Sequence, residues 1–111
     1  MEAYETMIKK IKIGYQDYVI HELDPQGMGN IDGKFNDKTG EIIIDSSLLP
    51  NVKAEILLHE VIHGIWHHFG LDSGGLSPER VVDSIGKGLA TVIRDNPEFL
   101  SWLEDNLQEG K

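Results

Sequence analysis

The stretch ILLHEVIHGIW, residues 56–66, places two histidines four residues apart inside an otherwise apolar run. At about 100° per residue in a helix, His59 and His63 lie along one side, and Glu60 lies close to them. Apolar residues before, between and after these three cover most of the remaining circumference. The stretch therefore predicts a helix that is buried on a broad face and carries one polar stripe.

The residues before this helix have the pattern of strands. Residues 7–20 are rich in Ile, Tyr and Val with partial alternation, and residues 33–47 form two short runs around a turn at residues 37–40. Pro25 and Gly27 mark turns between these two segments. The first half of the chain therefore predicts a small antiparallel β-sheet.

The residues after Pro50 have the pattern of helices. Three polar residues mark the predicted helix starts, namely Asn51 for a helix to about Phe69, Ser77 for one to about Arg94, and Asn96 for a third. The third helix carries one apolar stripe, formed by Phe99, Trp102, Leu103 and Leu107. Because strands precede helices and no linker separates them, the sequence predicts a single α+β domain over residues 1–111, a small antiparallel sheet followed by three helices.

Composition narrows the possible functions. The chain has 10 Lys and Arg residues against 19 Asp and Glu, and its net charge of −9 argues against a nucleic-acid or membrane partner. No apolar run approaches the roughly 18 residues of a membrane helix. The N-terminal residues lack the layout of a secretory signal, which predicts a cytoplasmic protein. Because there is no cysteine, any bound metal must have nitrogen and oxygen ligands.

The residue types of the opening stretch suit a metal site. Residues i and i+4 are about one helical turn apart, so the imidazoles of His59 and His63 can reach one Zn²⁺ at about 2.0–2.1 Å. Glu60 is then aimed beside the ion, where it can take a proton from the water that the ion activates. The HExxH pattern alone also arises by chance in unrelated proteins, so a third ligand is needed to decide.

Two acidic residues downstream are candidates for completing the metal site. Glu79 lies near the start of the second predicted helix, and Asp83 follows one turn later on the same face. Gly86 and Ala90 continue this face and would let the second helix pack closely against the first. The alternative is that Glu79 is an exposed first-turn carboxylate stabilised by the helix dipole, and that Asp83 is solvated.

The motifs HEVIH at 59–63 and ERVVD at 79–83 resemble those of the gluzincin metallopeptidases, a thermolysin-like group. The short length and the context LLHEVIHGIW resemble more closely the small ImmA/IrrE-type metallopeptidase domains of bacterial and prophage genomes. This resemblance implies a minimal zincin-like fold and Zn²⁺ as cofactor. It also implies that His59, His63 and Glu79 are the metal ligands, that Glu60 is the general base, and that Asp83 orients one ligand imidazole.

The resemblance further implies how a substrate binds. In such enzymes a hairpin precedes the active-site helix, and its edge strand pairs with an extended substrate. Residues 30–35 (NIDGKF) would be that edge and residues 41–45 (EIIID) its inner partner. The implied substrate is an extended segment of a protein or peptide, with a regulator protein such as a repressor as one candidate.

The chain departs from the larger enzymes of this group in one respect. Those enzymes have a second domain that supplies a Tyr or His to stabilise the oxyanion, and this chain has no room for one. Several residues are open candidates for that role, namely Tyr15, Tyr18, His67 and His68. His67 is otherwise expected to line a cleft or to be solvated, His68 to point elsewhere, and Trp66 to belong to the core.

Three functions follow from these observations. The leading one is a zinc-dependent metallopeptidase with Glu60 as its base. The second is a catalytically silent, metal-stabilised protein that acts as an interaction module. The third is a chain without metal, in which His59 and Glu79 form a buried hydrogen-bonded network.

Overall fold

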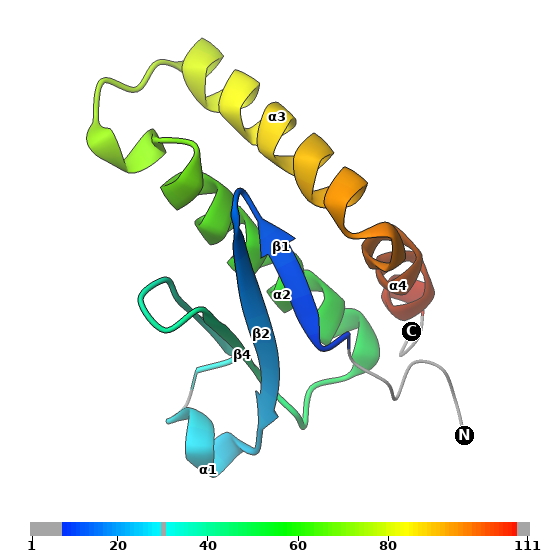
Figure 1. Cartoon of the computed structure of the whole chain (residues 1–111). Coiled ribbons are helices and arrows are strands. Elements are labelled where there is room, and N and C mark those ends of the chain that lie inside the picture. Colours follow the sequence, from blue (N-terminus) through cyan, green and yellow to red (C-terminus); the bar gives the residue numbers. More distant parts are fainter. Residues whose placement is uncertain (1–7, 30, 109–111) are drawn as a thin grey trace.

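Strands precede the long helices, so the predicted α+β class is confirmed in the computed structural model, which describes residues 8–29 and 31–108 (Figure 1). The strands are β1 (Lys10–Ile13), β2 (Gln16–Leu23), β3 (Gly33–Asn36) and β4 (Glu41–Asp45). The helices are α1 (Pro25–Met28), α2 (Pro50–His68), α3 (Pro78–Asp95) and α4 (Pro97–Gln108), with a short 3-10 turn, η2, at Leu71–Ser73.

The sheet is mixed rather than wholly antiparallel, with the strand order β1-β2-β4-β3. β1 pairs antiparallel with β2, and β3 pairs antiparallel with β4, but β2 and β4 run parallel. This parallel pair arises because the chain crosses from β2 through α1 to the sheet edge, and β4 then returns into the space beside β2. The hairpin prediction is therefore confirmed in one detail: β3 is an edge strand and β4 its inner partner.

The segment at residues 7–20, which has the pattern of strands, is a hairpin of two strands in its described part. Gly14 and Tyr15 form its turn, so that Ile13 pairs with Gln16. Alternate residues on each side of the turn are buried, as period-2 patterning requires: Ile11, Ile13, Tyr18 and Ile20. These side chains form one wall of the core.

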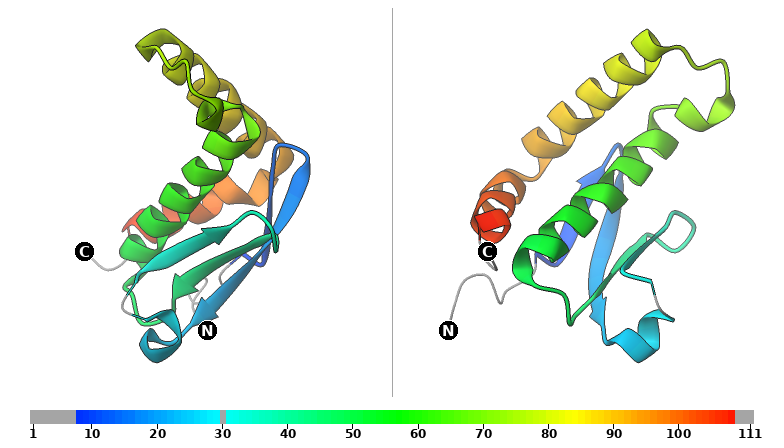
Figure 2. Two further views of the ribbon diagram at one scale, coloured as in Figure 1. Left: turned by 90° about the vertical axis from the view of Figure 1, so that its left-hand side faces the viewer. Right: turned by 180° about the vertical axis from the view of Figure 1, so that it is seen from behind.

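Helix α2 is the other wall of the core and the centre of the molecule. It lies across one face of the sheet, and α3 and α4 pack on its other side (Figures 1 and 2). Ala54, Leu57, Val61 and Ile65 of α2 are buried in a cluster that also includes residues of the sheet, α3 and α4. Within the described residues, no helix combines the length and the apolar character that crossing a membrane requires.

Helix α3 turns a different face to α2 from the one predicted. Gly88 and Val92 are its buried residues, whereas Glu79, Asp83 and Gly86 are exposed on the opposite side, about 180° away. Ala90, which shares that exposed face, is exposed too. The expected packing through Gly86 and Ala90 is therefore wrong, because the apolar stripe around Gly88 decides the orientation.

The helix starts differ in how their polar residues act. Ser77 caps α3 as predicted, since its side chain accepts a hydrogen bond from the backbone N–H of Arg80 at 3.2 Å. Asn51 does not cap α2, which begins at Pro50 after Leu49. Asn96 is buried, and its side chain bonds both backbone groups of Lys12, accepting from N–H at 2.8 Å and donating to C=O at 2.9 Å. Asn96 thus ties the end of α3 to strand β1.

Two glycines of α3 offer a matched test of this packing. A Cβ atom at Gly88 would overlap the side chain of Ile65, whereas a Cβ at Gly86 would meet no atom within 4 Å. We expect Gly88→Ala to lower the free energy of unfolding by about 1–3 kcal/mol through overpacking. We expect Gly86→Ala to raise it by about 0.5–1 kcal/mol, because Ala is the better helix former. Urea denaturation measures both, and equal effects would contradict the orientation of α3.

Candidate functional site

The three residues of the HExxH motif meet in the middle of α2, and we call them the motif site: His59, Glu60 and His63. One ligand atom from each lies within 4.8 Å of the others. The Nε2 atoms of His59 and His63 are 3.2 Å apart. Two ligands bound tetrahedrally to Zn²⁺ at about 2.0–2.1 Å stand roughly 3.3–3.4 Å apart. Both imidazoles are exposed, so the pair has a spacing that suits one ion and is open to solvent.

Glu60 lies beneath this pair, between α2 and the edge strand. Glu60 is 5% exposed. A Cβ atom added at Gly33 of β3 would come within 2.9 Å of the Glu60 Oε2 atom. A larger residue at this point of the strand would therefore have to displace the side chains of Ile56 and Glu60. Burial raises the pKa of Glu60, while the nearby His59 and His63 act in the opposite direction. A carboxylate whose pKa is raised toward neutrality can both accept and return a proton.

An apolar hollow adjoins the two histidines. It has a volume of about 350 Å³ and is lined by Ile62 and Trp66 together with His59 and His63. Trp66 is half-buried rather than part of the core cluster, so the expectation that it belongs to the core is wrong. The indole instead forms a wall beside the motif site.

The structure does not bring Glu79 or Asp83 to the motif site. Helices α2 and α3 run antiparallel, and they touch where Gly88 meets Ile65 (Figure 1). Glu79 stands nine positions before Gly88, or about 13 Å along the axis, toward the end of α2 that lies away from His59. Asp83 pairs with Lys87 at 3.1 Å on the solvent side. This arrangement matches the alternative of solvated carboxylates.

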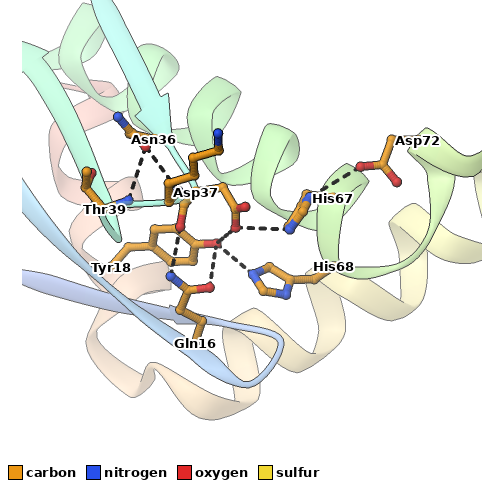
Figure 3. Close-up of polar contacts among 9 residues, drawn as sticks. Gln16, Tyr18, Asn36, Asp37, Thr39, His67, His68 and Asp72 are labelled. Carbon is orange, nitrogen blue, oxygen red and sulfur yellow. Dashed lines mark hydrogen bonds and ion pairs between the residues drawn. The ribbon is translucent and has the colours of Figure 1, made fainter.

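A second group of polar side chains, which sequence reasoning missed, gathers at the last turn of α2 (Figure 3). We call Asp37, His67 and His68 the turn site. His67 Nε2 lies 3.0 Å from Asp37 Oδ1, and His67 Nδ1 lies 3.2 Å from Asp72 Oδ2. Tyr18 Oη lies 2.6 Å from His68 Nε2 and 3.3 Å from Asp37 Oδ1.

The two most buried groups around the turn site keep their uncharged forms. Burial, with a smaller effect of Asp37, raises the pKa of the Tyr18 phenol. Burial and the neighbouring His67 lower the pKa of His68, against the opposite effect of Asp37. Tyr18 is therefore a hydrogen-bond donor at neutral pH, and His68 is a neutral imidazole.

Sequence reasoning had only a weak signal for this group. His67 and His68 are adjacent, which in a helix turns them about 100° apart, and Asp37 lies in a distant turn. Of the residues considered as oxyanion donors, Tyr18 and His68 contact each other, while Tyr15 is 85% exposed and packs edge-to-face with the His68 ring. No protein-family model, curated protein or solved structure matches this chain.

The raised pKa of Glu60 predicts a pH-dependent stability of metal-free protein. The folded chain holds this proton more tightly than the unfolded chain, so stability is lost as the pH rises from the unfolded pKa through the folded pKa. Glu60→Gln removes this loss. In chelator-treated protein we expect the variant to be the more stable at pH 7, by about 1.4 kcal/mol for each pH unit that separates the two pKa values.

The advantage of Glu60→Gln should shrink as the pH falls through the unfolded pKa of about 4.3 and be gone at about pH 3, where both states of the wild type are protonated. Urea denaturation of both proteins at the two pH values measures the difference. A gap that stays the same at both pH values would contradict the buried carboxylate.

Proposed function

We propose that this chain is a zinc-dependent peptidase, in which His59 and His63 hold the metal and Glu60 is the general base. The observation that carries the proposal is the position of Glu60. Its buried carboxylate lies within 4.8 Å of the ligand nitrogens of both imidazoles, against the edge strand of the sheet. The proposed base and the two proposed metal ligands thus lie close together on α2, with the base against β3.

The donor set supports a borderline ion such as zinc. Two imidazole nitrogens 3.2 Å apart are suited to Zn²⁺, and the carboxylate of Glu60 lies beside them, where a base for the metal-activated water is needed. Zn²⁺, when bound, lowers the pKa of water toward neutrality and polarises a carbonyl group.

Each residue of the motif site has a distinct part in peptide hydrolysis. His59 and His63 fix the reacting region at the exposed surface of α2. Glu60 accepts the proton of the attacking water, and its raised pKa keeps that proton available for the leaving amine. The peptide carbon gains the water oxygen, the C–N bond breaks, and the amine departs with the returned proton.

The surroundings of the motif site favour an extended peptide as substrate. Strand β3 is at the edge of the sheet, so its outer backbone groups can pair with a peptide that runs along it. Gly33 of this strand lies directly against Glu60. The hollow formed by Ile62 and Trp66 offers room for an apolar side chain of the same peptide. A protein segment that is unfolded or locally extended fits this surface.

Glu60→Gln tests the mechanism. The amide keeps the shape of the side chain but cannot accept a proton, so we expect zinc content to be retained while peptide cleavage falls at least about 10²-fold. Zinc is measured by mass spectrometry on untagged protein, and cleavage by mass analysis of a library of unstructured peptides. Cleavage at the wild-type rate by the variant would refute Glu60 as the base.

Glu79→Ala tests the ligand set that the resemblance implies. Because Glu79 faces solvent away from the motif site, we expect this variant to keep its zinc content, whereas His63→Ala loses most of it. Metal analysis of both variants beside the wild type gives the answer. A loss in Glu79→Ala as large as in His63→Ala would show that α3 turns Glu79 toward the metal.

A second candidate function is a metal-stabilised interaction module without turnover. The observation that favours it is the small donor set: within the described residues, the motif site contains two exposed histidines and one buried glutamate. Such a module would bind extended peptides equally well with Glu60→Gln. Peptide capture without cleavage by the wild type, at unchanged affinity in the variant, would favour the module over the peptidase.

A further inference from the structure

We propose that the turn site is a second metal site, in which Asp37, His67 and His68 bind a divalent first-row transition ion. It lies where the β3–β4 turn meets the C-terminal end of α2, one helical turn beyond the motif site. The proposal does not depend on peptidase activity, because none of its residues belongs to the HExxH motif.

The separations of the donor atoms suit a single ion. One ligand atom from each of the three residues lies within 4.8 Å of the other two. The distance from His67 Nε2 to Asp37 Oδ1 is 3.0 Å, a few tenths of an ångström below the roughly 3.3–3.6 Å between two tetrahedral ligands at bond lengths of 2.0–2.2 Å. Figure 3 shows these side chains pointing toward one another from a strand turn and a helix end.

His67 is held in the orientation that a ligand needs. Its Nδ1 lies 3.2 Å from Asp72 Oδ2 in the η2 turn, so the ring can carry its proton there and donate it to that carboxylate. The lone pair is then on Nε2, which is the nitrogen that faces Asp37. Metal-bound histidines generally have such a carboxylate or carbonyl on the second nitrogen, which fixes the tautomer.

Tyr18 can release the other imidazole without losing its own hydrogen bond. The phenol lies 2.6 Å from His68 Nε2, and 3.3 Å from Asp37 Oδ1. For His68 Nε2 to become a ligand, the imidazole must turn away from the phenol, whose hydroxyl then donates to the carboxylate instead. Tyr18 is thus a positioning residue that holds Asp37 in place, and the buried polar groups remain satisfied in both states.

Two imidazoles and a carboxylate suit Zn²⁺, Co²⁺, Ni²⁺ and Fe²⁺ better than Mg²⁺ or Ca²⁺. The side chains of His67 and Asp37 are 41% and 35% exposed, so an ion has a path from solvent. The bound ion would join the β3–β4 turn to the end of α2.

The experiment uses Co²⁺ as the probe, since its visible absorption reports nitrogen and oxygen ligands. Untagged, chelator-treated protein is titrated as the wild type, as His59→Gln/His63→Gln and as His67→Gln/His68→Gln. We expect two equivalents of Co²⁺ in the wild type and one in each double variant. Circular dichroism establishes that each protein is folded.

Asp37→Asn, made in the His59→Gln/His63→Gln background, separates a metal site from a structural network. The amide keeps an acceptor oxygen for Tyr18 but loses the anionic ligand, so we expect Co²⁺ affinity to fall at least about tenfold while the fold is kept. His21→Gln is the matched control. His21 also pairs with a carboxylate, Glu41 at 3.1 Å, but belongs to no group of three donors in the described part of the chain. We expect its substitution to change nothing.

Two results would overturn the second site. One is a folded His59→Gln/His63→Gln protein that binds no Co²⁺, and the other is Co²⁺ affinity that Asp37→Asn leaves unchanged. If that background fails to fold, the count in His67→Gln/His68→Gln decides, because loss of one equivalent from the wild-type value supports the site and no loss refutes it. The motif site could instead bind no metal. The wild type would then hold a single equivalent of Co²⁺, which only the turn-site variants remove. That result would refute the proposed peptidase and leave the second metal site standing.

Discussion

Helix α2 must be covered on almost every side, and the rest of the molecule is arranged to cover it. The sheet, α3 and α4 each take part of its apolar circumference. One strip is left open, formed by residues at intervals of four, Glu55, His59, His63 and His67, all of them exposed. Both groups of potential metal ligands lie on this strip or beside it. Both proposed sites thus use the one surface of the central helix that the core does not need.

Local features could be predicted from the sequence because the causes lie within a few residues. The α2 helix follows from its apolar periodicity, the cap of α3 from Ser77, and the β3–β4 turn from residues 37–40. The parallel pairing of β2 with β4 could not be predicted in this way. It depends on which strands meet after the chain crosses through α1, and the local pattern of β4 is compatible with either neighbour. The turn site was missed for the same reason, since Asp37 and His67 are brought together only by the fold.

The orientation of α3 shows how two signals in one helix compete. Four residues at helical spacing, from Glu79 to Ala90, suggested a metal-binding and close-packing face. The opposite face carries Ile85, Leu89 and Val92, and burying each such side chain contributes about 1.5–3 kcal/mol. A free carboxylate gains more from water than from an apolar neighbour. Hydrophobic burial therefore outweighs small-residue spacing, and two of the three implied ligands remain together while the third faces solvent.

The contact between Asn96 and strand β1 determines how the sheet can grow. One amide side chain occupies both the N–H and the C=O of Lys12, as a neighbouring strand would. The backbone groups of Lys12 are thereby unavailable to another strand, which disfavours strand addition at the β1 edge and favours it at β3. An assembly built by adding strands edge to edge needs two open edges in every copy to continue. With a single favoured edge, such growth ends when two β3 edges have met, so pairing at β3 does not by itself build a fibre.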